Sequence, residues 1–426
     1  MVPHLLTALK GPLQDLEQRI LDATPQIERW FRLEWQEHTP AFYCSVDLRN
    51  AAFKLAPVDT SLFPVGFDHL SAPMLPLAQQ AAMAAIEKYC PDARNLLLIP
   101  DLGRLDRING CYGQNILRLA ALLRQTGLSV RFGSFDPSIT EPTAIDVADG
   151  QTLTIEPLVR NGRRLGLRDF DPCTIVLNDD LSEGLPDILQ DIYEQTLLPP
   201  LHAGWAVRRR SQHLAAYQDV AKKFGKAFDI DPWLINPAFA RCGPVDLREP
   251  ADRARLTAAV ETVLKQMRSK YREYGVADVP YAVIKPEAGA DGRGMVMVRD
   301  LARLPTLIDQ LAAKAPERDL VVQEGVPTIE TMEGGTAEPI VYMIDRYVIG
   351  GYYRVNAERG RDENLIAPGL RFVPLPFATS CNMPDCSAGP EHAQNRFYAY
   401  GVVARLAMLA SAIELERTDP DQSLYG

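Results

Sequence analysis

Apolar residues recur every three to four positions in several stretches of the chain, which predicts amphipathic helices. In residues 252–274 the apolar positions fall on one side and Gly275 follows, so this stretch is typical of a helix with one buried face. The same spacing predicts helices over residues 3–37, 73–90, 116–123, 211–224, 301–315 and 396–416. The last of these is apolar on most faces apart from Arg405, so we expect it to be buried.

Short apolar runs predict strands between these helices. Residues 95–101 (NLLLIPD) precede a helix, and residues 129–134 (SVRFGS) follow it. This order predicts a βαβ unit with parallel strands, and ligands bind at the carboxyl ends of such strands. A polar loop is expected there over residues 103–113, and its Arg104, Arg107 and Asn109 are candidates for binding a substrate carboxylate. A solvated polar loop is the alternative.

Residues 281–298 (YAVIKPEAGADGRGMVMV) predict a strand, a glycine-rich loop and a second strand. Lys285 ends the first strand, and the loop carries Gly289, Gly292 and Gly294. Glycines let backbone N–H groups approach an anion, and a lysine adds positive charge, so the pattern indicates a phosphate cradle. The loop matches neither GxxxxGK[ST] nor GxGxxG and opens no helix, so an ordinary glycine turn in a β-hairpin is the alternative.

Residues 45–67 (SVDLRNAAFKLAPVDTSLFPVGF) place charged side chains in an otherwise apolar stretch with little helical period. The charged residues are Asp47, Arg49, Lys54 and Asp59. Because Pro57, Pro64 and Gly66 would make the segment rigid, we interpret it as a site-lining loop or a pair of short strands. A surface connection is the alternative.

Three further stretches contribute candidates. Residues 208–210 are consecutive arginines before a predicted helix, where a bound anion would offset their unfavourable interaction with the helix dipole. A solvated basic face is the alternative. Residues 320–327 (LVVQEGVP) predict a strand that ends in a turn, and residues 338–355 predict a hairpin with its turn at 345–346.

Composition narrows the class of protein. The chain has 426 residues, of which 46% are hydrophobic and 23% charged, and this predicts two or three globular domains. A net charge of −10 argues against a general binder of nucleic acid or anionic membrane. Seven scattered cysteines indicate free thiols in a reducing cytoplasm, and no signal peptide or membrane span is expected. Cys381 and Cys386 with His392 offer at most half a zinc site, so unligated thiols are expected.

The order of elements from Tyr281 to Gly369 resembles the ATP-grasp fold, in which a glycine loop closes over the phosphates of ATP and a strand end contacts the adenine. The residues that this resemblance implies for the phosphates are Lys285, Gly289, Gly292, Arg293, Gly294 and Arg209. Those implied for the adenine are Gln323, Glu324 and Val326. Arg354 and Asn364 are implied as catalytic residues that face the γ-phosphate and the acyl group.

More closely, most of the chain resembles the proteobacterial type of glutamate–cysteine ligase. The strings that carry the resemblance lie between residue 46 and about residue 372: VDLRNAAFKLAPVDTSLFPVGF, DPWLINP, YAVIKPEAGADGRGMVMV, VVQEGVPT and VYMIDRYVIGGYYRVN. The implied cofactors are ATP and Mg²⁺, and the implied substrates are L-glutamate and L-cysteine. Asp47, Arg49, Arg104, Arg107 and Asn109 are then the candidates for binding these substrates.

One part of the ATP-grasp pattern is missing. Such enzymes place Mg²⁺ on a late strand that reads Glu-x-Asn, and no such strand follows Asn364. Asp59-Thr-Ser61 resembles an altered version of that motif at the other end of the chain, so residues 46–67 are predicted to complete the active site in a permuted arrangement. Glu338 and then Asp345 are the other candidate metal ligands.

The expected fold is therefore α/β (α+β), an ATP-grasp fold with a preceding βαβ substrate domain and an N-terminal helical segment. The expected units are residues 1–90, 91–200 and 201–426. The resemblance implies a cytoplasmic enzyme that phosphorylates the γ-carboxylate of glutamate and passes the acyl group to cysteine. A homo-oligomer is a candidate assembly. The alternative is another ATP-grasp ligase, such as a glutathione synthetase or a dipeptide ligase.

Overall fold

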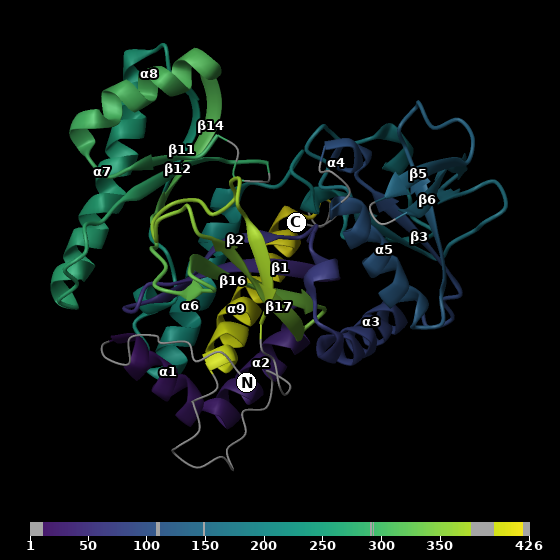
Figure 1. Cartoon of the computed structure of the whole chain (residues 1–426), viewed down its shortest axis with the longest axis horizontal. Coiled ribbons are helices and arrows are strands. Elements are labelled where there is room, and N and C mark those ends of the chain that lie inside the picture. Colours follow the sequence, from purple (N-terminus) through teal and green to yellow (C-terminus); the bar gives the residue numbers. More distant parts are fainter. Residues whose placement is uncertain are drawn as a thin grey trace.

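The computed structural model describes residues 12–107, 111–147, 150–289, 292, 294–375 and 396–420, without the side chains of residues 106, 107, 111 and 396. In this part of the chain, sheets and helices form a mixed α/β fold, which confirms the expected class (Figure 1). Arg293 and Asn109, the side chain of Arg107, and the residues considered for zinc lie outside the described residues.

A central antiparallel sheet combines strands from an early and a late part of the sequence. Its strand order is β18–β17–β16–β1–β2, with β15 paired to β16. Its strands are β1 (Tyr43–Asn50), β2 (Leu55–Ser61), β15 (Thr331–Met332), β16 (Gly335–Ile344), β17 (Tyr347–Asn356) and β18 (Arg371–Pro374). Asp47 of β1 lies opposite Asp59 of β2 and Ile340 of β16. Residues 43–61 therefore belong to the same sheet as residues 331–374. The hairpin predicted over 338–355 is present as β16 and β17.

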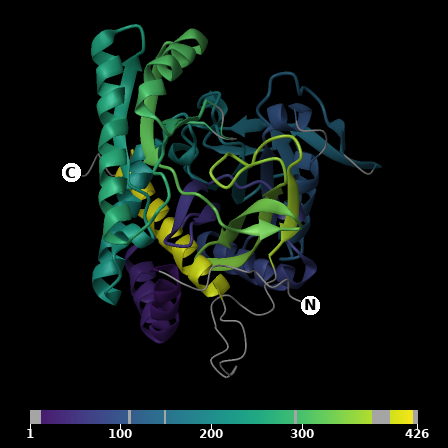
Figure 2. The same cartoon turned by 60° about the vertical axis from the view of Figure 1, so that its left-hand side comes forward.

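Helix α9 (Arg396–Thr418) packs against this sheet and against α6 (Arg210–Phe228), while α1 (Pro12–Asp22) and α2 (Thr24–Glu37) lie nearby (Figure 2). Residues 397–418 are long and apolar enough to cross a membrane, but 89% of that apolar window is buried inside the protein. The expectation that this helix is buried is confirmed.

A second sheet is mostly parallel and has the order β10–β9–β3–β4–β6–β5. Its strands are β3 (Asn95–Pro100), β4 (Ser129–Ser134), β5 (Thr143–Val147), β6 (Gln151–Pro157), β9 (Thr174–Asn178) and β10 (Thr196–Leu198), and β7 (Val159–Asn161) pairs with β8 (Arg164–Gly166) beside it. Because β3 and β4 are parallel and α5 (Cys111–Arg124) connects them, the predicted βαβ unit is confirmed. Helix α3 (Leu75–Tyr89) packs against α5.

The prediction of a polar loop over residues 103–113 is wrong. Helix α4 (Leu102–Arg107) occupies its first half, and α5 begins at Cys111. The physical reason is a cap: the backbone N–H of Arg104 donates to Asp101 Oδ1 at 3.0 Å, which satisfies a donor at the start of α4.

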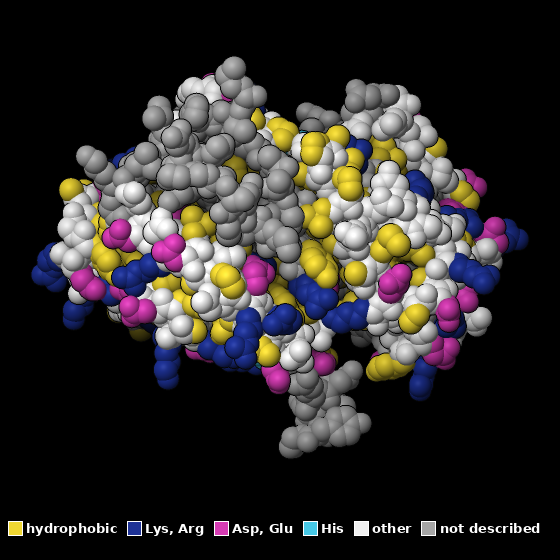
Figure 3. Space-filling view, turned by 90° about the horizontal axis from the view of Figure 1, so that it is seen from below, with side chains coloured by type: hydrophobic (Ala, Val, Ile, Leu, Met, Phe, Trp, Pro, Cys, Tyr) yellow, Lys and Arg dark blue, Asp and Glu magenta, His cyan; other side chains and the backbone are white. Residues whose placement is uncertain are grey.

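A small antiparallel sheet has the order β11–β14–β12–β13. It comprises β11 (Phe239–Asp246), β12 (Ala282–Pro286), β13 (Val296–Val298) and β14 (Glu317–Glu324), and α7 (Pro250–Glu273) packs against it, with α8 (Leu304–Lys314) close by. The pairing of β12 with β13 confirms the hairpin around the glycine loop, and the apolar side of α7 is buried as predicted. Seen from below, Lys, Arg, Asp and Glu side chains are interspersed among apolar ones (Figure 3).

Candidate active site

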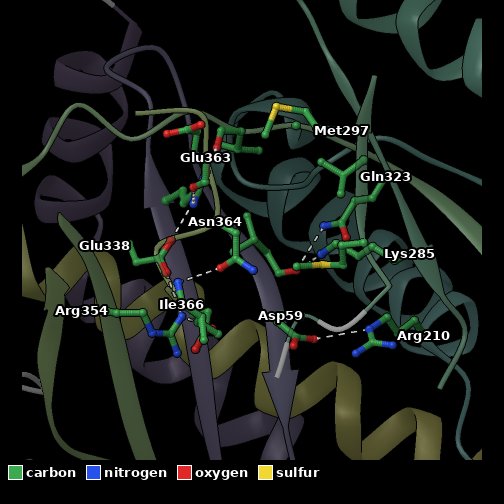
Figure 4. A pocket seen from close by; sticks show the side chains of 18 of the residues that line it. Asp59, Arg210, Lys285, Met297, Gln323, Glu338, Arg354, Glu363, Asn364 and Ile366 are labelled. Atoms are coloured by element: carbon green, nitrogen blue, oxygen red, sulfur yellow. Dashed lines mark hydrogen bonds and ion pairs between the residues drawn. The ribbon is translucent and has the colours of Figure 1, made fainter. Parts of the chain in front are cut away.

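A cavity of about 280 Å³ is lined by residues of the central sheet, the small antiparallel sheet and α4. Many of the candidates from the sequence line it: Asp47, Arg49, Asp59, Arg104, Lys285, Gly292, Gln323, Glu324, Val326, Glu338, Arg354 and Asn364. Asn364 lies between Glu338 and Arg354 on one side and Lys285 and Gln323 on the other (Figure 4). The fold thus gathers residues from β1, β2, β12, β14, β16 and β17 around one space.

Lys285 enters the cavity wall from the end of β12. Its side chain is buried, and Nζ donates to the backbone oxygen of Val58 in β2 at 2.7 Å. Burial lowers the pKa of Lys285 to about 8, and the positive charges of Arg210 and Arg49 act in the same direction while Asp59 opposes them. A buried cation in the wall of a cavity suits an anionic ligand.

Gly292 of the glycine loop lies next to Asn364. Gly292 has φ +66°, and a Cβ at this position would lie 2.6 Å from Asn364 Nδ2, so any other residue would strain the backbone and displace the Asn364 side chain. Gly289 and Gly294 also have positive φ, of +106° and +72°, but they do not line the cavity.

Two arginines and two carboxylates meet across β1, β16 and β17. Arg354 Nη1 donates to Asp47 Oδ2 at 2.9 Å and to Glu338 Oε1 at 2.7 Å, and Arg49 Nε donates to Glu338 Oε2 at 2.8 Å. Burial alone would raise the pKa of Glu338, but Arg49 and Arg354 outweigh it and lower that pKa. Burial raises the pKa of Asp47, which Arg354 opposes and the charges of Glu338 and Asp59 reinforce.

Arg49 was a candidate for a substrate carboxylate, but its nitrogens are occupied by protein groups. Besides Glu338, it donates to the backbone oxygens of Val326 at 3.1 Å and Glu363 at 2.6 Å. The Glu324 side chain is likewise engaged, with Lys54 and the backbone N–H of Ala238. Both residues line the cavity as parts of its frame.

Asp59 faces Arg210, with Oδ1 and Nε 3.8 Å apart. Burial would raise the pKa of Asp59, but Arg210, Lys285 and Arg208 together lower it, so this carboxylate is ionised. Its side chain is 41% exposed, against 19% for Asp47 and 4% for Glu338, so it is the most accessible of these three carboxylates.

Arg210 lines the cavity where Arg209 was expected. It donates to the backbone oxygens of Pro286, at 2.7 Å, and Gly289, which tie it to the start of the glycine loop. Arg209 instead contacts backbone oxygens of residues 205–208 and lies 3.6 Å from Asp319. Three consecutive arginines carry no periodic signal, so the sequence did not distinguish the one that faces inward.

Arg104 lines the cavity from α4 and is held by two carboxylates, Asp101 at 3.2 Å and Asp180 at 2.7 Å. Asp101, Asp179 and Asp180 lie within 4.8 Å of one another and are the described acidic group close enough to share one metal ion. Burial raises the pKa of Asp179 to about 7. None of these three carboxylates is among the residues lining the cavity.

Asp345 was a candidate metal ligand, and the structure places it away from the cavity. It lies in the turn after β16, 3.5 Å from Lys88, and seven positions beyond Glu338, a span of about 23 Å along an extended strand. Since Glu338 lies inside β16 and Asp345 lies beyond its far end, they cannot bind one ion together.

Further uncharged side chains line the cavity: those at positions 45, 58, 61, 63 and 65 belong to the segment interpreted as site-lining, and the others were not predicted. These side chains include Ser45, Val58, Ser61, Phe63, Val65, Tyr281, Val283, Met295, Met297 and Ile366. A signal was available in β12, because Tyr281, Val283 and Lys285 alternate along one face of the strand. Val283 and Met297 are opposite each other in the β12–β13 pair, so they form one apolar strip.

These residues fit a nucleotide and a magnesium ion. The apolar strip beside Gln323 and Val326 can accept a base, and Lys285, Arg210 and the loop near Gly292 can accept phosphates. Asp47, Asp59 and Glu338 do not form a group that could enclose a metal alone, within the described residues. Mg²⁺ commonly uses one or two carboxylates together with substrate phosphates. Asp59 and Glu338 supply protein ligands of that type and number.

Comparison with known proteins places this chain in a family. A family model described as glutamate-cysteine ligase matches residues 17–415. A crystal structure from Methylobacillus flagellatus KT, described as a candidate gamma-glutamylcysteine synthetase, has 50% identity and a TM-score of 0.89 over 98% of this chain and 100% of that chain.

Two other solved structures are much less similar. They are the D-cycloserine synthetase DcsG (15% identity, TM-score 0.36, 77% of this chain and 82% of that chain) and D-alanyl-alanine synthetase A from Vibrio cholerae O1 biovar eltor (10%, 0.34, 74% and 81%). No curated protein matches the chain significantly. The family match across most of the sequence shows that the chain belongs to the glutamate–cysteine ligase family of ATP-dependent ligases.

Proposed function

We propose that the protein joins the γ-carboxylate of L-glutamate to the amine of L-cysteine with ATP and Mg²⁺, which gives γ-glutamylcysteine, ADP and phosphate in the first step of glutathione biosynthesis. The observation that carries the proposal is one cavity lined by Lys285 and Arg210 at one side, Arg354 and Glu338 at the other, and an apolar strip. Free thiols at Cys44, Cys90, Cys173 and Cys242 are consistent with a cytoplasmic enzyme.

The chain's residues have to place three substrates and balance charge. The strip of Val283 and Met297 receives the adenine, and Lys285 and Arg210 hold phosphate oxygens. When bound through Asp59 and Glu338, Mg²⁺ would neutralise charge on the transferring phosphoryl group. Asn364 lies between Lys285 and Arg354, and Asn364 and Arg354 face the glutamyl phosphate that forms.

The amino acids occupy the end lined by Ser45, Ser61, Phe63, Val65 and Arg104. Arg104 offers a guanidinium already oriented by Asp101 and Asp180 to a substrate carboxylate. Gly292 lies against Asn364, and a glycine loop at this place would keep water from the acyl phosphate until the cysteine amine attacks it. No protein nucleophile is needed.

The test is ADP release by the purified protein with Mg²⁺-ATP and L-glutamate, with and without L-cysteine, together with the mass of the product. We expect ADP that depends on both amino acids and a product with the mass of γ-glutamylcysteine. Turnover only with γ-glutamylcysteine and glycine would instead assign the second step of the same pathway. No turnover with either pair would overturn the proposed reaction.

A further inference from the structure

Residues 324–330 cross from β14 of the small sheet to β15 of the central sheet, and the tip of the β1–β2 hairpin holds this crossover along its length. Lys54 Nζ lies 2.9 Å from Glu324 Oε1, Arg49 Nη1 donates to the Val326 oxygen at 3.1 Å, and Asn50 Nδ2 donates to Glu330 Oε1 at 3.0 Å. The Asn50 backbone oxygen also accepts the N–H of residue 329 at 2.8 Å. Contacts at both ends and the middle leave the crossover little freedom.

The Lys54–Glu324 pair is wholly inside the protein, since both side chains have 0% exposure. Lys54 also donates to the Asn236 oxygen at 3.1 Å and lies 4.3 Å above the Trp233 ring, and Glu324 Oε2 accepts the Ala238 N–H at 2.8 Å. Charges buried this deeply persist only when they are paired, so neither group is available to a substrate. The pair fixes the strand end that borders the apolar strip.

Arg49 extends the same contacts to the opposite wall of the cavity. One guanidinium joins the oxygen of Val326 to the oxygen of Glu363, which precedes Asn364, and to the Glu338 carboxylate. The planar fork of arginine suits this role because its donors have fixed directions. The Arg49 side chain therefore links the nucleotide side of the cavity to the acyl-transfer side and sets the distance between them.

We propose that Arg49, Asn50 and Lys54 form a brace that fixes the crossover, and that Arg49 and Lys54 are positioning residues for the nucleotide rather than ligands of glutamate or cysteine. This inference rests on the proposed function, because it assumes that ATP occupies the end of the cavity beside residues 323–326. The brace predicts that its loss weakens nucleotide binding selectively.

The test is the double variant Lys54→Met with Glu324→Gln, which removes both buried charges together and leaves the Gln amide able to bond with Ala238 and Asn236. ATP binding is measured by calorimetry, and KM is measured separately for ATP and for glutamate. We expect the ATP Kd and KM to rise about tenfold, as for loss of a charge-assisted hydrogen bond, while the glutamate KM stays within about twofold of wild type. Lys223→Met with Glu34→Gln removes an ion pair of 2.6 Å away from the cavity and is the matched control.

Unchanged ATP affinity in a folded double variant would overturn the brace, as would equal losses for ATP and glutamate. If the double variant does not fold, Arg49→Lys replaces it, because lysine keeps the charge and loses the fork. A rise in the ATP Kd supports the brace, and an unchanged value overturns it; kcat should fall as well, because Arg49 also holds Glu338. Absence of ATP binding by the wild type would overturn the proposed function instead.

Discussion

Arg354 and Glu338 lie opposite each other in the β16–β17 ladder, and Arg354 Nη1 donates to Glu338 Oε1 at 2.7 Å. The same nitrogen reaches Asp47 in β1, so one guanidinium ties together three neighbouring strands of the central sheet. With Arg49 on the other oxygen of Glu338, two arginines balance two carboxylates in the cavity wall. The residue proposed to face the acyl phosphate is thus held in place before any substrate binds.

Replacing Arg354 with Lys should lower kcat by about a hundredfold or more, because an ammonium cannot keep the fixed fork while it stabilises charge in the transition state. The ATP Kd should change much less. Steady-state kinetics and calorimetry measure the two effects, and Arg346→Lys in the turn of the same hairpin is the control. A kcat close to wild type would show that Arg354 has only a structural role.

Asp59→Asn should abolish turnover at low Mg²⁺, and much higher Mg²⁺ should restore only part of it. The reason is that Asp59 is the most accessible carboxylate of the proposed ligands. The measurement is a magnesium titration of ADP release at saturating ATP. Asp219→Asn on the surface of α6 removes a carboxylate paired with Arg417 and should leave the titration unchanged. A wild-type magnesium dependence in Asp59→Asn would remove this residue from the metal site.

Lys285 should make ATP binding sensitive to pH near 8. Burial lowers its pKa from 10.5 to about 8, so the free enzyme loses this charge as pH rises through 8, and the ATP KM should then increase by up to about tenfold per pH unit. Below about pH 7 the KM should be flat. Lys285→Arg keeps its charge throughout, so the increase should vanish; its persistence would assign the effect to another group.

The lowered pKa of Lys285 also affects folding: rising pH should weaken ATP binding but favour the folded state. Between pH 8 and 10.5 the unfolded chain binds more protons at this lysine than the folded chain does, so the contribution of Lys285 to stability becomes less unfavourable as pH rises. Urea denaturation of wild type and Lys285→Met at pH 7 and pH 10 measures it. The gain in stability from the substitution should be larger at pH 7, and an equal gain at both values would contradict the lowered pKa.

Gly292→Ala should reduce kcat at least about tenfold with little change in Tm, because the new Cβ would strike Asn364 and the backbone has φ +66°. Gly162→Ala is a matched control: its φ is +61°, and a Cβ there meets nothing within 4 Å. Activity and thermal unfolding of both variants separate backbone strain from the contact with Asn364. Equal kinetics in the two variants would show that the contact is unimportant.

Periodicity in the sequence was sufficient for most elements and for the βαβ unit, because alternation and helical spacing are local. It was insufficient at Asp101, where one carboxylate caps α4 and turns an expected loop into a helix. Arg49 and Asp345 carry the right charges for a site, but their roles depend on Glu338 and on Lys88, which lie far away in the sequence. Which arginine of 208–210 faces inward also depends on distant oxygens, those of Pro286 and Gly289.

The position of β1 between β2 and β16 has a consequence for synthesis of the protein. Residues 43–50 leave the ribosome early, but their partner strand at 335–344 emerges only after most of the chain has been made. The β1–β2 hairpin, which carries Asp47 and Asp59, therefore remains unpaired with β16 during most of synthesis. Pairing between strands so distant in sequence slows folding. A fragment that begins at residue 201 would lack β1 and β2, two strands of the central sheet, so the rest of that sheet cannot be separated from the first part of the chain at that point.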